Sequence, residues 1–106
     1  MSDRDGSSPA EANGSARPRL LFFHSPRSGP SRRVEGFLAQ VLQRRGNHRT
    51  FHVYRVAHEE RPDLTARFAI EEVPTLVVVE GKRVRGKLGR PRGCDEIESF
   101  LAPWLK

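Results

Sequence analysis

An apolar run at residues 20–23 leads through a short polar turn into an amphipathic helix at residues 31–45, and this arrangement constrains the fold most. The run predicts a buried strand, and the helical spacing of the later apolar residues predicts the helix. Where a strand turns into a helix, free N–H groups and the positive end of the helix dipole converge, so α/β proteins place their chemistry there. The turn, Ser28-Gly29-Pro30-Ser31, is therefore the first candidate for a functional site.

The rest of the chain alternates predicted strands and helices. Residues 51–56 and 76–79 are runs typical of strands, and residues 83–88 alternate in polarity as a half-exposed hairpin strand does. Residues 62–68 predict a short helix, and a last apolar stripe predicts a helix that ends near Ala102. A crossover through a helix joins parallel strands, so this order predicts an α/β fold. We expect a four-stranded mixed sheet, in spatial order 2-1-3-4, with helices on both faces.

The N-terminal segment, residues 1–18, has almost no large apolar side chain after Met1. Such a segment buries too little surface to offset its ordering entropy, so we expect a disordered polar tail before one domain at residues 19–106. The tail has no apolar stretch typical of secretion signals, and no apolar run in the chain approaches the roughly 18 residues that span a membrane. The sequence therefore predicts a cytoplasmic protein that does not enter the membrane.

The predicted domain is basic, with 17 basic and 10 acidic side chains. This balance favours acidic partners, although a solvated basic surface without a partner is the simpler interpretation. Nucleic acid is a less favoured partner, because the chain has no aromatic-studded RNA-binding motif and no zinc-finger spacing. We expect no cofactor and no metal site, since the four histidines lack metal-ligand spacing.

The turn at residues 28–31, a Val-Pro-Thr loop at residues 73–75 and the predicted order of strands and helices together make residues 19–106 resemble the thioredoxin family. Residues 23–31 lie where the family has its strand, bend and Trp-Cys-Gly-Pro-Cys motif, so Ser28 and Ser31 take the two cysteine positions. Val73-Pro74-Thr75 matches the family's cis-proline loop, and an apolar strand follows it. The resemblance implies a thioredoxin-like fold that is truncated at the N-terminus, because the polar tail does not match the family's first strand and helix.

Three departures from the family concern the chemistry. A serine hydroxyl titrates far above a thiol and forms no disulfide, so Ser28 and Ser31 cannot do dithiol chemistry. Phe22 takes the position of the family's buried acid, and Arg27 replaces the tryptophan beside the first cysteine. Together these changes imply a redox-inactive protein, more a binding module than an enzyme.

The resemblance also implies a groove for an extended peptide beside the cis-proline, where the backbone of the preceding residue pairs with the peptide. Flanking arginines, among them Arg92, would favour an acidic peptide or protein partner. The predicted binding residues are Arg27, Ser28, Val73, Pro74, Thr75, Gly89 and Arg90.

Several interpretations of these residues stay open. Ser28 could be a nucleophile with His24 as its base, but an N-cap of the following helix is the favoured role. The same helix start could bind an anion together with Arg32. Cys94, the only cysteine, could be a reactive thiol in a thiol redox protein, although a small residue at a helix cap is the simpler interpretation.

The strand at residues 51–56 is predicted to lie at one edge of the sheet. An edge strand has unpaired N–H and C=O groups, and Phe51, Val53 and Tyr54 favour strand pairing. The sequence thus predicts a weak homodimer, or recruitment of a partner, through this strand. Arg55 opposes such pairing, so a monomer is the open alternative.

Overall fold

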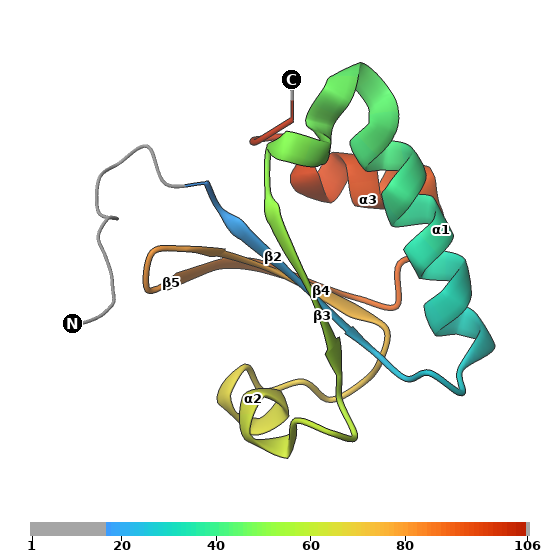
Figure 1. The fold of residues 1–106 in the computed structure, drawn as a ribbon, viewed down its shortest axis with the longest axis vertical. Helices are drawn as coiled ribbons and strands as arrows, with labels where there is room; N and C mark the ends of the chain where they lie inside the picture. The colour runs from blue at the N-terminus through green and yellow to red at the C-terminus, as the bar shows by residue number, and fades with distance from the viewer. Residues whose placement is uncertain (1–16, 106) are drawn as a thin grey trace.

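The computed structural model describes residues 17–105, in which helices cover both faces of one sheet (Figure 1). Every predicted strand and helix is present, and most of the boundaries differ from those predicted by one or two residues. In chain order the elements are β2 (Arg19–His24), α1 (Gly29–Gln43), the 3₁₀ helix η1 (Arg44–Arg49), β3 (His52–Ala57), α2 (Pro62–Arg67), β4 (Thr75–Glu80), β5 (Arg83–Gly89) and α3 (Cys94–Leu101).

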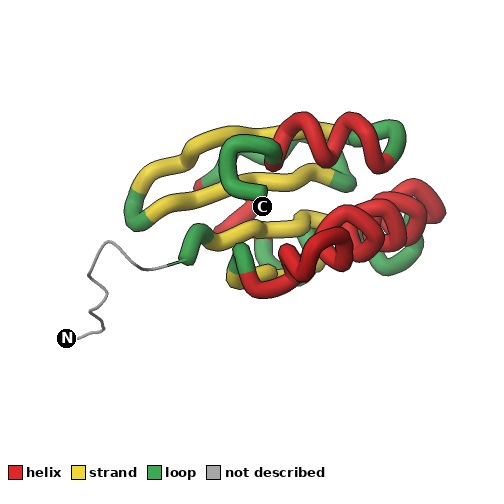
Figure 2. Tube along the Cα trace, turned by 90° about the horizontal axis from the view of Figure 1, so that it is seen from above, coloured by secondary structure: helices red, strands yellow, loops and turns green. Residues whose placement is uncertain are grey.

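The sheet has the order β3-β2-β4-β5, which confirms the predicted order 2-1-3-4. β2 pairs with β3 in parallel and with β4 antiparallel, and β5 pairs antiparallel with β4. Figure 2 shows the strands running side by side. The parallel pair is joined through α1, so the turn after β2 and the start of α1 lie at the carboxyl end of a central strand.

Apolar residues of β2 and β4 alternate between two cores, one on each face of the sheet. Leu20 and Phe22 pack into a core with α1 and α3, whereas Phe23 packs into a smaller core with α2. α2 lies across the sheet from the other two helices in Figure 1. All of β4 except its last residue is buried, as expected for a central strand covered on both faces.

α1 ends at Gln43, two residues before the predicted end at residue 45. The sequence pattern did not predict the 3₁₀ helix η1 that follows it. The chain tightens into η1 around Asn47, which is buried. The side-chain amide of Asn47 donates to the carbonyl of Arg44 at 2.7 Å, and its oxygen accepts from the hydroxyl of Thr50 at 2.9 Å. Gly46 lies inside this tightened turn and adopts φ 70°, a left-handed conformation that glycine takes up without steric strain.

Residues 1–16 of the predicted tail lie outside the described residues. Arg17 contacts the end of η1, where its guanidinium donates to the carbonyl of Arg49 at 3.0 Å. Pro18 contacts the start of β3, where its carbonyl accepts from the N–H of His52 at 2.9 Å. Among the described strands β3 forms one edge of the sheet, and its Val53 is 40% exposed.

No helix within residues 17–105 is both long enough and apolar enough to cross a membrane.

Candidate functional site

Three serines close a ring of hydrogen bonds around the bend between β2 and α1. The N–H of Ser28 donates to the carbonyl of Ser25 at 3.0 Å, and the N–H of Ser25 donates to the hydroxyl of Ser31 at 3.1 Å. The N–H of Ser31 donates in turn to the hydroxyl of Ser28 at 3.2 Å. We call this arrangement the serine ring. Ser28 is the N-cap of α1, which confirms its favoured role, and Ser31 is only 2% exposed.

His24 precedes the bend but takes no part in the serine ring. The His24 ring stacks on Phe22, with 5.3 Å between the ring centroids. Burial lowers the pKa of His24, and the nearby positive charge of Arg55 lowers this pKa further. A serine nucleophile needs its base within hydrogen-bond reach. In the part of the chain that the structure describes, no hydrogen bond joins His24 to Ser28 or Ser31, so the geometry does not favour the nucleophile interpretation.

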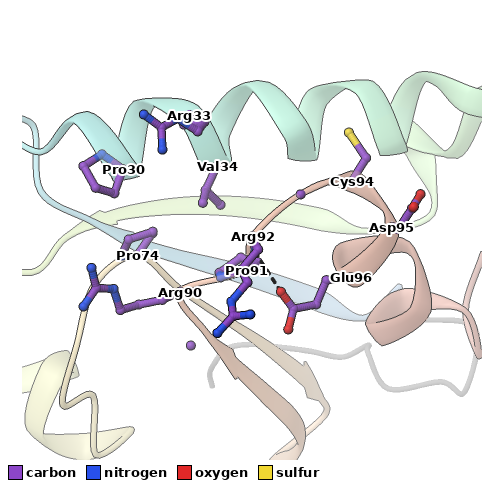
Figure 3. Close-up of a pocket in the computed structure, with 12 residues that line it drawn as sticks. Pro30, Arg33, Val34, Pro74, Arg90, Pro91, Arg92, Cys94, Asp95 and Glu96 are labelled. Atoms are coloured by element: carbon purple, nitrogen blue, oxygen red, sulfur yellow. Dashed lines mark hydrogen bonds between the residues drawn. The ribbon is translucent and has the colours of Figure 1, made fainter.

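A hollow of about 1150 Å³ lies between the start of α1, the loop before β4 and the segment that joins β5 to α3 (Figure 3). We call it the cis-proline hollow, because the Val73–Pro74 peptide bond in its wall is cis. The N–H of Arg90 donates to the carbonyl of Pro74 at 2.7 Å, which fixes the two walls together. Pro30 of α1 faces Pro74 in Figure 3.

The hollow brings together only part of the predicted binding set. Pro74, Gly89 and Arg90 line it, as does Arg92. Thr75 is buried, and its hydroxyl donates to a backbone carbonyl at 2.6 Å, so it supports the loop from behind. Outside the lining lie four predicted residues: Arg27, Ser28, Val73 and Thr75.

Sequence reasoning missed the wall that α1 provides. Pro30, Arg33 and Val34 line the hollow, whereas the predicted Arg32 does not. Positions i, i+3 and i+4 share one face of a helix, so the helical spacing counted from Pro30 contained this signal. The hollow also includes Glu96, whose carboxylate accepts from the N–H of Arg92 at 2.7 Å.

Cys94 is the first residue of α3, and Gly93 is the N-cap, so the expectation of Cys94 as the cap was off by one position. The thiol is half-buried and lies 3.1 Å from the side-chain oxygen of Gln40 on α1. Figure 3 shows the sulfur directed toward α1. The geometry therefore gives the thiol a packing role between the two helices, at the margin of the hollow.

The charges around the hollow leave its arginines available. Within residues 17–105 the guanidinium groups of Arg33, Arg90 and Arg92 form no ion pair, and all three residues are exposed. Two carboxylates, Asp95 and Glu96, lie on the α3 side. The described residues contain no cluster of His, Cys, Asp or Glu that could hold a metal ion.

Comparison with solved structures gives the fold. Thioredoxin O2 from Arabidopsis thaliana in its oxidized state superposes with a TM-score of 0.71 at 16% identity, covering 91% of this chain and 82% of that one. Deadhead, a germline-specific thioredoxin from Drosophila melanogaster, gives 0.70 at 20% identity, with 84% and 82% covered. Oxidized mitochondrial thioredoxin 3 from Saccharomyces cerevisiae gives 0.68 at 17% identity, with 81% and 77% covered.

Sequence comparison gives the family. No curated protein matches this chain in sequence. The family model described as Thioredoxin, however, matches residues 9–103, which is most of the chain. The strand order and the helices on both faces agree with that match. The chain therefore belongs to the thioredoxin family.

Proposed function

We propose that this thioredoxin-family protein binds an extended acidic segment of a partner protein at the cis-proline hollow and performs no dithiol–disulfide exchange. The serine ring is the observation that carries the redox part of this proposal. It keeps the bend and the helix start in place through hydroxyl acceptors, at the positions where the family resemblance puts the two thiols.

The absence of dithiol exchange follows from the chemistry of the side chains. Thiol–disulfide exchange needs a thiolate nucleophile and a second thiol to resolve the mixed disulfide. Ser28 and Ser31 provide neither, and Cys94 is the only cysteine of the sequence. Phe22, which is 1% exposed, has no group that could relay a proton at the position of the family's buried acid.

Binding of an extended segment is supported by the backbone beside the cis peptide bond. Val73 adjoins the hollow through Pro74 without lining it, and among residues 17–105 neither its N–H nor its C=O has a hydrogen-bond partner. An extended peptide satisfies such groups by pairing as an added strand does. The unpaired guanidinium groups of Arg33, Arg90 and Arg92 supply the preference for carboxylates.

A binding experiment with matched variants tests the peptide proposal. Fluorescence anisotropy compares a labelled glutamate-rich peptide with a lysine-rich peptide of the same apolar content. Arg90→Glu should weaken binding of the acidic peptide more than Arg27→Glu does, because both change the net charge equally and only Arg90 lines the hollow. Binding should also weaken as salt rises, since exposed charges are screened over about 8–10 Å at physiological ionic strength. Equal affinity for both peptides would overturn the proposal.

The redox part of the proposal has its own test. We expect no reduction of insulin disulfides with a dithiol donor, whereas steady turnover at the rate of an ordinary thioredoxin would refute this part. Ser28→Cys combined with Ser31→Cys should restore only part of the activity, because Phe22 and Arg27 remain.

A thiol function of Cys94 is the second candidate, because this residue lines the same hollow as Pro74. Mass spectrometry after incubation with oxidized glutathione measures whether the thiol forms a mixed disulfide. Rapid and complete modification of the folded protein, absent in Cys94→Ser, would favour this candidate. The contact with Gln40 predicts slow modification instead.

A further inference from the structure

A second groove lies on the face of the sheet that α2 covers, and none of its described lining residues also lines the cis-proline hollow. Its volume is about 430 Å³. Leu21, Phe68 and Val79 form an apolar floor, and Arg19, Arg67 and Lys82 stand among the lining residues. We call it the basic-rimmed groove. In Figure 1 the helix beside it, α2, lies across the sheet from α1 and α3.

The apolar part of the groove is left open because α2 covers little of its face. This helix spans six residues, and none of them is buried. Tyr54 is 48% exposed and Val84 is 54% exposed, and both line the groove. They are two of the three large exposed apolar residues in the part of the chain that the structure describes. A contiguous apolar surface bounded by polar residues is typical of an interaction site.

The charged side chains that line the groove are all positive. Among the residues that the structure describes, no acidic side chain lines it, and Arg19, Arg67 and Lys82 form no ion pair. The other two basic residues of the lining, Arg55 and Arg61, are paired with carboxylates outside it. Two of these cations are held in place without an acid. The Arg19 guanidinium donates to the carbonyl of Gly81 at 2.6 Å, and that of Arg67 lies 5.9 Å from the centroid of the Phe68 ring. These contacts orient the two guanidinium groups and leave their positive charge available to a carboxylate of a partner.

We infer that the basic-rimmed groove binds an acidic amphipathic segment of a partner protein. The apolar side chains of the segment lie on the floor, and its carboxylates pair with the basic side chains of the rim. Charge complementarity selects this occupant, because a second copy of this chain would bring its own net charge of +6. A lipid surface fits less well, since membrane docking needs protruding apolar residues and this surface is hollowed. This inference is independent of the function proposed for the cis-proline hollow.

The test uses the full chain and a designed peptide whose leucines recur at helical spacing and whose other positions are mostly glutamate. A control peptide keeps the leucines and replaces the glutamates with lysine. Backbone NMR chemical shifts locate the bound peptide, and fluorescence anisotropy gives the affinity. We expect the acidic peptide to shift residues of α2, of the start of β2 and of the β4–β5 turn.

Two pairs of matched variants separate the apolar and the charged contributions. Val84→Ser should weaken binding severalfold, whereas Val53→Ser should not, because Val53 is similarly exposed but does not line the groove. Combined Arg67→Glu and Lys82→Glu should weaken binding by about three- to tenfold, as expected for exposed charges at a binding site. Arg32→Glu, an exposed arginine outside both hollows, should have little effect.

Four outcomes would overturn the inference. The first is equal binding of the acidic and basic peptides, and the second is a set of chemical shift changes that lies outside the groove. The third is binding of phosphatidylglycerol vesicles or of an oligonucleotide at the same residues in preference to the peptide. The fourth is a concentration-dependent dimer that Val84→Ser disrupts, which would assign the groove to a second copy.

Discussion

Replacing Ser31 with alanine tests whether the serine ring holds the bend at the start of α1. The change removes the hydroxyl that accepts from the N–H of Ser25 at 3.1 Å, and it keeps the backbone N–H that the Ser28 hydroxyl caps. A fully buried donor that is left without a partner costs about 1–3 kcal/mol. Ser25 is half-buried, so some water can replace the bond, and we expect a loss of about 1–2 kcal/mol in the free energy of unfolding.

Urea unfolding, followed through the fluorescence of Trp104, measures this loss. The residue is the only tryptophan of the chain, and its ring packs against Phe51 with 6.2 Å between the centroids. Each kcal/mol corresponds to a shift in Tm of roughly 4–8 °C for a domain of this size. Ser31→Cys should fall between serine and alanine, because a thiol is a weaker acceptor than a hydroxyl.

Ser99→Ala is the matched control for Ser31→Ala. Ser99 is exposed on α3, and its hydroxyl makes no hydrogen bond among residues 17–105, so alanine should be neutral or slightly stabilising there. If Ser31→Ala unfolds at the same urea concentration as wild type, the ring is not a structural element. The hydroxyls of Ser28 and Ser31 would then not be what keeps the bend and the helix start in place.

Four other measurements address the rest of the fold. Leu101→Ala, at a fully buried position, should lower the free energy of unfolding by about 2–5 kcal/mol in a denaturant titration. A loss below about 1 kcal/mol would contradict the burial of this side chain. Gly86→Val should lower the free energy of unfolding by about 1–3 kcal/mol, because even a Cβ there would lie 2.9 Å from the Phe100 ring. The lowered pKa of His24 means that only the unfolded chain gains a proton just below pH 6.5. The contribution of His24 to the free energy of unfolding should therefore be fully present above pH 6.5 and decrease as the pH falls toward the pKa of His24 in the folded protein. His24→Gln should make the free energy of unfolding less dependent on pH in this range. In sedimentation velocity we expect weak self-association that Val53→Pro reduces, and monomers in both proteins would exclude pairing through β3.

The sequence predicted the fold well because its periodicities are strong. The apolar run at residues 76–79 belongs to a strand that is buried on both faces, and the alternation at residues 83–88 belongs to a half-exposed strand. The unforeseen element, η1, depends on side-chain hydrogen bonds of Asn47 that periodicity does not encode.

The site was harder to predict, because motif positions do not say which side chains line a cavity. The capping role of Ser28 was predictable from its place before a helix. Val73 and Thr75 belong to the same loop motif as Pro74, yet only Pro74 lines the hollow. Arg33 lines it instead of Arg32, since a shift of one residue turns a side chain by about 100° around the helix.

The unequal cover of the two sheet faces has a consequence for hydrogen exchange. Within residues 17–105, eleven buried apolar residues form the core under α1 and α3, whereas four form the core on the side of α2, which buries none of its own residues. Local opening follows the least buried contacts, so amides of α2 should exchange through openings that leave the sheet intact. Amides of β2 and β4 should exchange only when the whole domain unfolds. Because α2 forms one wall of the basic-rimmed groove, a segment bound there should slow exchange in α2 before it slows exchange in the central strands.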